Sequence, residues 1–171
     1  MSETITQELA SHASRMYRVA LRIVGSVDAA QEVAQDACVK ALRRAETFDG
    51  RAALATWLHR ITVNCAKDAM RSDGRRASTL QAFQDSVAQG TIGAATDSPA
   101  AVAEKRELAD LAWALLDKLP EDCRSAFALT QLDGYSYDEA AEIEGQPRGT
   151  MASRVFRAKK IILEQMSAHI E

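Results

Sequence analysis

The chain has 171 residues, and its 21 lysine and arginine side chains against 24 aspartate and glutamate side chains give a formal net charge of −3. Hydrophobic residues make up 47% and charged residues 26%, a composition that is typical of globular proteins and excludes wholesale disorder. The length allows one ordinary domain or two small ones. The mildly acidic total gives no indication of a nucleic-acid partner.

Helical periodicity divides the first part of the chain into three predicted helices. Apolar residues recur at spacings of three and four from about residue 4 to residue 24, and Gly25 ends this first helix. Asp28 opens the second helix, and a Phe48-Asp49-Gly50 break follows it. The third helix is predicted from about residue 53 to residue 71.

The third predicted helix has an apolar stripe and an opposite polar face. Trp57 lies on the apolar stripe, so we expect it to pack in the core. The polar face consists of residues at spacings i, i+4, i+7 and i+11, which place them on one side of a helix. These residues are Arg60, Asn64, Lys67 and Arg71.

Between about residues 72 and 99 the helical period is lost, and Ser, Thr, Gly, Gln and Ala predominate. A structureless loop of this length is uncommon inside one compact domain, which favours two domains. We therefore predict a first domain over residues 1–72, a flexible linker over 73–98 and a second domain over 99–171. The chain shows no convincing strand pattern, so the predicted fold class is all-α.

The second domain carries the pattern of a helix-turn-helix unit. After a helix that starts at Pro120 and closes at Asp133-Gly134, Ser136-Tyr137-Asp138-Glu139 forms a capping box at the start of a short helix. Gly145 permits a left-handed turn, and a longer helix is predicted from about Arg148 to His169. The apolar stripe of that helix is Met151, Val155, Ala158, Ile162 and Met166.

Positive charge gathers at the front of this last helix. The segment from Pro147 to Lys160 contains five positive residues and no acid. Small and hydroxyl-bearing residues at its start would let the chain approach phosphates and base edges closely. A solvated basic face on an ordinary bundle helix would give the same pattern, so this alternative stays open on periodicity alone.

The sequence contains no pattern that predicts catalysis, a metal or a cofactor. Its three cysteines form no CxxC motif, its histidines are isolated, and no phosphate-binding glycine loop or nucleophile–base pair is present. The N-terminus lacks the features of a signal peptide, and no apolar run is long enough to span a membrane. We therefore expect a cytoplasmic protein that is not an enzyme, without membrane insertion.

Motifs in both halves resemble those of a known family. In the second half these are Leu119-Pro120-Glu121-Asp122, the capping-box segment, Pro147-Arg148-Gly149-Thr150 and the SRVFRA run that starts at Ser153. In the first half they are Ala34-Gln35-Asp36-Ala37 and the TWLHRITVN run that ends at Asn64. Together they resemble regions 4 and 2 of the extracytoplasmic-function (ECF, group 4) sigma factors of the sigma-70 family, with sigma-E/AlgU-like proteins the most similar group.

The resemblance implies an alternative sigma factor, active in a stress response, that binds core RNA polymerase and directs promoter-specific transcription initiation. It places −35 recognition in the last helix, at Arg148, Thr150, Ser153, Arg154, Phe156 and Arg157. It places −10 recognition and melting in the third helix, with Asn64 capturing a flipped base and Arg60, Lys67 and Arg71 holding the strand. It places contacts with the clamp helices of the polymerase β′ subunit at Glu32, Gln35 and Asp36.

The resemblance also implies further partners and exposes three departures from the family pattern. The β flap of polymerase and an anti-sigma factor are the expected additional partners. Glu144 and Gln146 stand where apolar residues usually pack the two helices of the unit together, and Ala152 stands where a cation is usual. These departures support an alternative in which the chain is a sigma-like decoy that binds an anti-sigma factor without productive DNA reading.

Overall fold

A computed structural model describes residues 2–72, 107 and 110–170 of the chain. Its first part contains α1 (Ser2–Val24), α2 (Val27–Arg43), a short 3-10 turn η1 (Ala45–Thr47) and α3 (Leu54–Ser72). The described residues form helices and connecting loops without a strand, which confirms the all-α fold class. The predicted linker, 73–98, lies outside the described residues.

Local signals explain where the first helices begin and end. Gly25 follows α1 with a positive φ of 71°, a conformation that glycine adopts without steric cost. The Ser26 hydroxyl then accepts a hydrogen bond from the Ala29 N–H at 3.3 Å and caps α2. Trp57 of α3 is partly buried and packs against Phe48, with ring centroids 5.3 Å apart, which confirms the expected core role.

The second part of the chain contains a helical stretch over residues 110–117, followed by α6 (Glu121–Phe127), α7 (Tyr137–Glu144) and α8 (Arg148–Ile170). Between α6 and α7 lies a π-helical turn, η2 (Ala128–Leu132), in place of the regular helix predicted there. The Asp133 N–H donates to the Ala128 carbonyl five residues earlier, at 2.9 Å, and so widens the turn.

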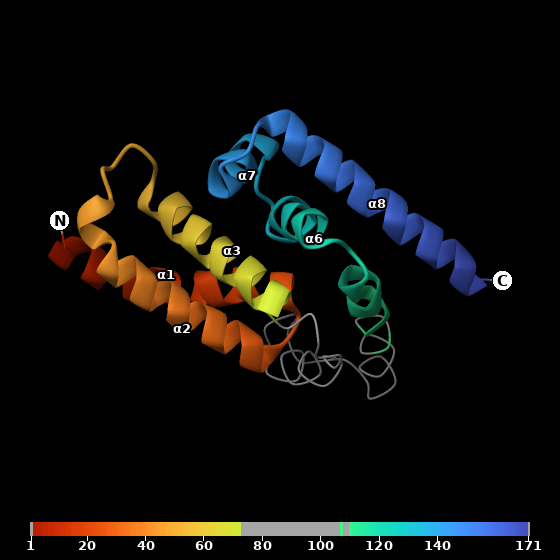
Figure 1. The fold of residues 1–171 in the computed structure, drawn as a ribbon, viewed down its shortest axis with the longest axis horizontal. Helices are drawn as coiled ribbons and strands as arrows, with labels where there is room; N and C mark the ends of the chain where they lie inside the picture. The colour runs from red at the N-terminus through yellow and green to blue at the C-terminus, as the bar shows by residue number, and fades with distance from the viewer. Residues whose placement is uncertain (1, 73–106, 108–109, 171) are drawn as a thin grey trace, which may run out of the picture.

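The two parts, hereafter the N-terminal unit (α1–α3) and the C-terminal unit (from residue 110 to α8), pack directly on each other. Figure 1 shows α6 and α7 beside α3, with α6 between α3 and α8, and the space-filling view shows α3 side chains against those of α6. Buried residues of both units, among them Leu58, Leu129 and Ile143, belong to one continuous apolar cluster.

Polar contacts also join the two units. Arg22 of α1 forms an ion pair with Asp133 and donates to the Leu132 carbonyl at 2.7 Å. The buried His59 ring places Nδ1 2.8 Å from the Tyr135 hydroxyl. The chain therefore folds into a closed arrangement in which the N-terminal unit covers part of the C-terminal one.

Candidate nucleic-acid interface

The helix-turn-helix unit is built by local hydrogen bonds around α7. The Ser136 hydroxyl accepts the Glu139 N–H at 3.2 Å, and the Glu139 carboxylate accepts the Ser136 N–H at 2.8 Å. These hydrogen bonds to the charged form hold the pKa of Glu139 below its usual value. Gly145 follows α7 in the left-handed region at φ 63° and turns the chain into α8, as the sequence predicted.

The front of α8 presents most of its predicted DNA-reading residues to solvent. Arg148, Ser153 and Arg157 are exposed, Thr150 is partly buried, and Phe156 is 72% exposed. The opposite face is buried through Met151, Val155 and Ala158. Ile162 of the predicted stripe is partly buried and packs beside Ala158, whereas Met166 is 43% exposed where α8 extends past the rest of the chain (Figure 1), so the stripe ends at Ile162.

Arg154 differs from its neighbours on α8. Its side chain is only 20% exposed, and its guanidinium contacts Glu144 at 2.8 Å and Asp122 at 3.1 Å. The arginine thus lies at the edge of the predicted reading face, bound by two carboxylates of its own unit.

The predicted −10 residues lie on one side of α3, as their spacing requires. Asn64 is exposed and borders a polar pocket of about 310 Å³, which Lys67, Arg71, Lys40 and Arg44 also line. The cations around this pocket suit a nucleotide phosphate, and the amide of Asn64 can hydrogen-bond to a base edge.

Three of these four α3 residues are bonded to the C-terminal unit, which the sequence did not predict. Arg60 donates to the Glu142 carbonyl at 2.6 Å, and Arg71 contacts Glu121 at 2.7 Å. Lys67 is the most enclosed, with its side chain 11% exposed and its ammonium 2.8 Å from Asp122 and 2.7 Å from Glu144. The ammonium holds the pKa of the Asp122 carboxyl below its usual value.

The side chain of Glu144, expected from the family pattern to weaken the unit, is fully buried and has several hydrogen-bond partners. Ser125 donates to its Oε1 at 2.5 Å, while Lys67 and Arg154 contact its Oε2. A buried carboxylate with three partners of this kind is compensated rather than destabilising. Gln146, by contrast, is exposed. The sequence does single out Glu144, because it is an acidic residue at a position where the family pattern has an apolar one.

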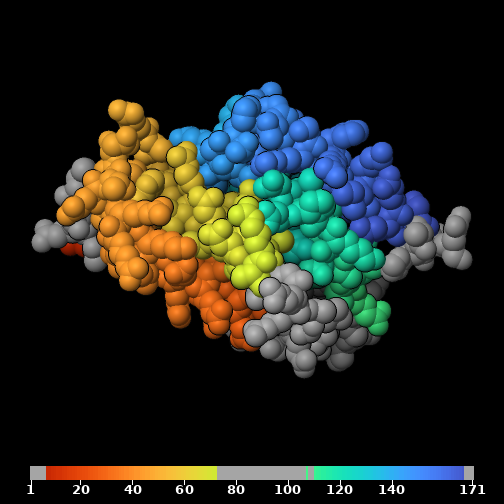
Figure 2. Space-filling view, in the orientation of Figure 1, coloured from red at the N-terminus to blue at the C-terminus, as the bar shows by residue number. Residues whose placement is uncertain are grey.

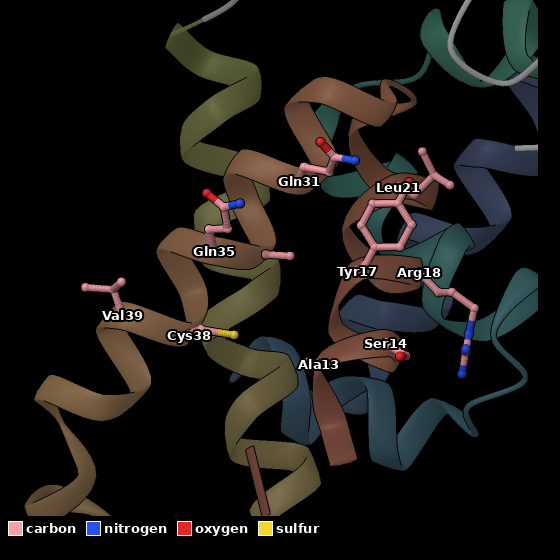
Figure 3. A pocket seen from close by; sticks show the side chains of 10 residues that line it. Ala13, Ser14, Tyr17, Arg18, Leu21, Gln31, Gln35, Cys38 and Val39 are labelled. Atoms are coloured by element: carbon pink, nitrogen blue, oxygen red, sulfur yellow. The ribbon is translucent and has the colours of Figure 1, made fainter. Parts of the chain in front are cut away.

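The predicted polymerase-binding residues lie on the outer face of α2. Glu32, Gln35 and Asp36 are all exposed, and Asp36 forms an ion pair with Lys40 at 2.9 Å. Beside Gln35, a mostly apolar groove of about 820 Å³ runs between α1 and α2. Figure 3 shows Tyr17 and Leu21 of α1 on one side of this groove and Gln35 and Cys38 of α2 on the other.

The described residues contain no His, Cys, Asp and Glu group that could hold a metal ion. The three cysteines, Cys38, Cys65 and Cys123, are free thiols. None of the helices in the described part of the chain has the length and apolar content needed to cross a membrane.

Comparisons with known proteins identify both halves of the chain. Residues 9–76 match the family model of sigma-70 region 2, and residues 109–162 match that of sigma-70 region 4. Over 134 residues, the chain is 36% identical to the ECF RNA polymerase sigma-E factor of Haemophilus influenzae, covering 77% of this chain and 71% of the relative. It is 38% identical over 134 residues to the sigma-E factor of Escherichia coli K12, covering 77% and 70%.

Two solved structures share the fold over almost the whole chain. The first is the sigma factor RpoE with the anti-sigma factor NepR from Bartonella quintana, with TM-score 0.64, 26% identity, and 96% of this chain and 98% of that one covered. The second is CnrH with the cytosolic domain of CnrY, with TM-score 0.66, 24% identity, and 98% and 90% covered. The motif-based prediction is thus confirmed by two family models and by relatives covered over most of their length, and the chain belongs to the ECF sigma factors of the sigma-70 family.

Proposed function

We propose that this sigma factor binds core RNA polymerase through its N-terminal unit and reads two promoter elements, the −35 element with α8 and the −10 element with α3. The observation that carries the proposal is the exposed front of α8, where cations, a hydroxyl and an aromatic ring lie on the outer face of a capped helix-turn-helix unit.

The −35 element is read by residues at the front of α8. Arg157 and Arg148 are exposed cations that suit base edges and phosphates in a major groove, and the Ser153 hydroxyl lies on the same helix. Phe156 supplies an apolar surface for a thymine methyl group or a sugar. Thr150 flanks these residues, and Arg154 joins them after release from its carboxylates.

The −10 element is melted and held by α3. Asn64 captures a flipped base with its amide, and Arg60, Lys67 and Arg71 hold the phosphates of the separated strand. The polar pocket at Asn64 supports this assignment because cations surround an exposed amide there.

Core polymerase docks on the outer face of α2. Glu32, Gln35 and Asp36 follow a helical i, i+3, i+4 spacing on that face and pair with basic residues of the β′ clamp helices.

The C-terminal unit contacts the β flap of polymerase. The two domains span residues 1–72 and 99–171, and residues 73–98 link them. The protein works in the cytoplasm, without chemistry of its own.

An anti-sigma factor holds this protein inactive until a stress signal releases it. The support is that the similar RpoE structure contains an anti-sigma factor bound to its sigma factor.

The alternative of a sigma-like decoy loses one of its supports, because the burial of Glu144 is compensated by hydrogen bonds and ion pairs.

Run-off transcription tests the proposal. Core polymerase with this protein is expected to start transcripts at promoters selected from a randomised DNA library, while core alone does not. Arg157→Ala should weaken −35 discrimination by about 1–3 kcal/mol, whereas Lys159→Ala, a matched cation change on the same helix, should leave base preference unchanged.

Promoter opening gives a separate readout for α3. Asn64→Ala should reduce permanganate reactivity of −10 thymines more than it reduces duplex binding. A protein that binds core polymerase and an anti-sigma factor, yet supports no transcript from any selected promoter, would instead be the decoy.

A further inference from the structure

The polar pocket at Asn64 has two walls, and the proposed −10 role uses only the wall that α3 supplies. The pocket lies between α2 and α3, which pack along each other (Figure 2). Asn64, Lys67 and Arg71 line it from α3. The opposite wall consists of Lys40, in the last turn of α2, and Arg44, which directly follows that helix.

Lys40 and Arg44 lie on the same side of the end of α2. The Arg44 N–H donates to the Lys40 carbonyl at 3.0 Å and so continues the helical turn. Residues four positions apart share one face of a helix and are about 6 Å apart along its axis. Two cations at this separation can bind successive phosphates of one extended DNA strand.

The guanidinium of Arg44 is available to a phosphate. Its side chain is exposed and contacts no carboxylate of the described residues. Lys67 and Arg71 on the opposite wall, by contrast, each contact a carboxylate of the C-terminal unit. Arg44 is therefore a pocket cation whose charge no carboxylate of the fold compensates.

The ammonium of Lys40 is held toward α3 and keeps a donor for a phosphate. It lies 3.4 Å from the Sγ of Cys65, a buried residue of α3, and 2.9 Å from the Asp36 carboxylate. A lysine ammonium has three donors, so one remains after these two contacts. The ion pair with Asp36 is an exposed i, i+4 pair, which contributes little to stability and does not prevent a phosphate from binding.

We infer that Lys40 and Arg44 bind the phosphates of the separated −10 strand from the α2 side of the pocket, opposite the cations of α3. The strand then runs between the two helices, beside the amide of Asn64. This inference rests on the proposed −10 role of α3 and adds two phosphate-binding residues to it. Because these contacts are made to phosphates, they add affinity without base preference.

The test compares two neighbouring arginines, Arg44→Ala and Arg43→Ala. Both side chains are exposed at the end of α2, but Arg43 does not line the pocket. Loss of net charge and of the interaction with the helix dipole is therefore similar in the two variants. Each variant is assembled with core polymerase, and binding of the holoenzyme to a fluorescent single-stranded −10 oligonucleotide is measured at increasing salt concentration.

The salt dependence counts the phosphate contacts. For a single strand, each contact contributes about 0.7 to the slope of log affinity against log salt concentration. After loss of one contact, a rise from about 50 to about 200 mM salt should cost about 2.5-fold less affinity than in the wild type. We expect this smaller slope for Arg44→Ala and the wild-type slope for Arg43→Ala. Equal slopes in the two variants would overturn the inference.

Lys40→Gln provides a second variant, which removes the ammonium and keeps a long polar side chain. It should reduce the slope by the same amount, and a wild-type slope would overturn the assignment of Lys40. The loss of affinity should also be the same on the −10 strand and on a strand with the same bases in scrambled order. A loss confined to the −10 strand would indicate a base contact and overturn the phosphate assignment.

Two further readouts separate this inference from the proposed function. Both variants should bind core polymerase as tightly as the wild type, and weaker core binding with an unchanged DNA slope would overturn the inference. If the wild-type holoenzyme binds the −10 strand no better than the scrambled strand, base capture by Asn64 fails. A smaller slope in Arg44→Ala than in Arg43→Ala would still support strand binding by the α2 wall in that case.

Discussion

Acidification is expected to weaken the contact between the two units, because His59 is buried there in its neutral form. The ring is 1% exposed, and its Nδ1 lies 2.8 Å from the Tyr135 hydroxyl, while its Nε2 has no hydrogen-bond partner among the described residues. Burial, and then the positive charge of Arg15 and the nearby His12, lower the pKa of His59 from 6.5 to about 4.

The size and sign of the effect follow from this pKa. The unfolded chain takes up the His59 proton near pH 6.5, whereas the folded chain resists it until about pH 4. Protons therefore favour the unfolded state between these values, and stability falls as the pH falls through that window. The loss attributable to His59 is about 2 kcal/mol between pH 7 and pH 5, and about 3 kcal/mol below pH 4.

Urea unfolding of the wild type and of His59→Gln at pH 7 and pH 5 measures this loss. At each pH, the unfolding free energy of the wild type is subtracted from that of His59→Gln. The effect of the carboxyl groups cancels in this subtraction, because they titrate in both proteins. That difference should move by about 2 kcal/mol in favour of the variant on going from pH 7 to pH 5. The same difference at both pH values would refute the reasoning. Tyr135→Phe should retain most of the wild-type pH dependence, because burial is the main cause of the lowered pKa of His59.

Three further predictions test the packing and the caps. Gly25→Ala should lower the melting temperature clearly more than Gly134→Ala. Both glycines have a positive φ, but only a Cβ at residue 25 would meet the Trp113 ring, at 2.9 Å. Equal decreases in melting temperature would contradict the close contact between residue 25 and Trp113. Ser136→Ala should reduce the unfolding free energy by about 1 kcal/mol through loss of the α7 cap, and an unchanged urea midpoint would count against it. A disulfide reagent at pH 7 should modify Cys38 first and the two buried thiols only after unfolding; immediate reaction of all three would contradict the burial.

Features that depend on neighbouring residues in the chain were predictable from the sequence. The end of α1 at Gly25, the Ser136–Glu139 capping box and the left-handed Gly145 all appear where the pattern placed them. These features depend on backbone sterics and on hydrogen bonds within a few residues. The spacing of polar residues on α3 also survives folding, because helical geometry alone sets it.

The contacts between the units were not predictable by the same reasoning. The bonds of Lys67 and Arg71 to α6 and α7 join residues about fifty or more positions apart in the chain, and no local rule encodes such pairs. The π-helical turn η2, which contacts α1, was not predicted either, because the apolar spacing of its residues also fits a regular helix. A solvated basic face and a face covered by carboxylates look identical in a periodicity pattern.

Glu144 shows why a residue-type expectation fails when tertiary partners converge. An apolar side chain at this position would pack α7 against α8, but it would leave Lys67 and Arg154 with Asp122 as their shared carboxylate. Burying two cations with one anion is more costly than burying a balanced set. The hydroxyl of Ser125 and the two cations instead surround a carboxylate that reaches all three. The same acids that make the chain mildly acidic overall therefore lie next to cations proposed to meet DNA, so net charge is a poor guide to nucleic-acid binding when opposite charges are paired within the fold.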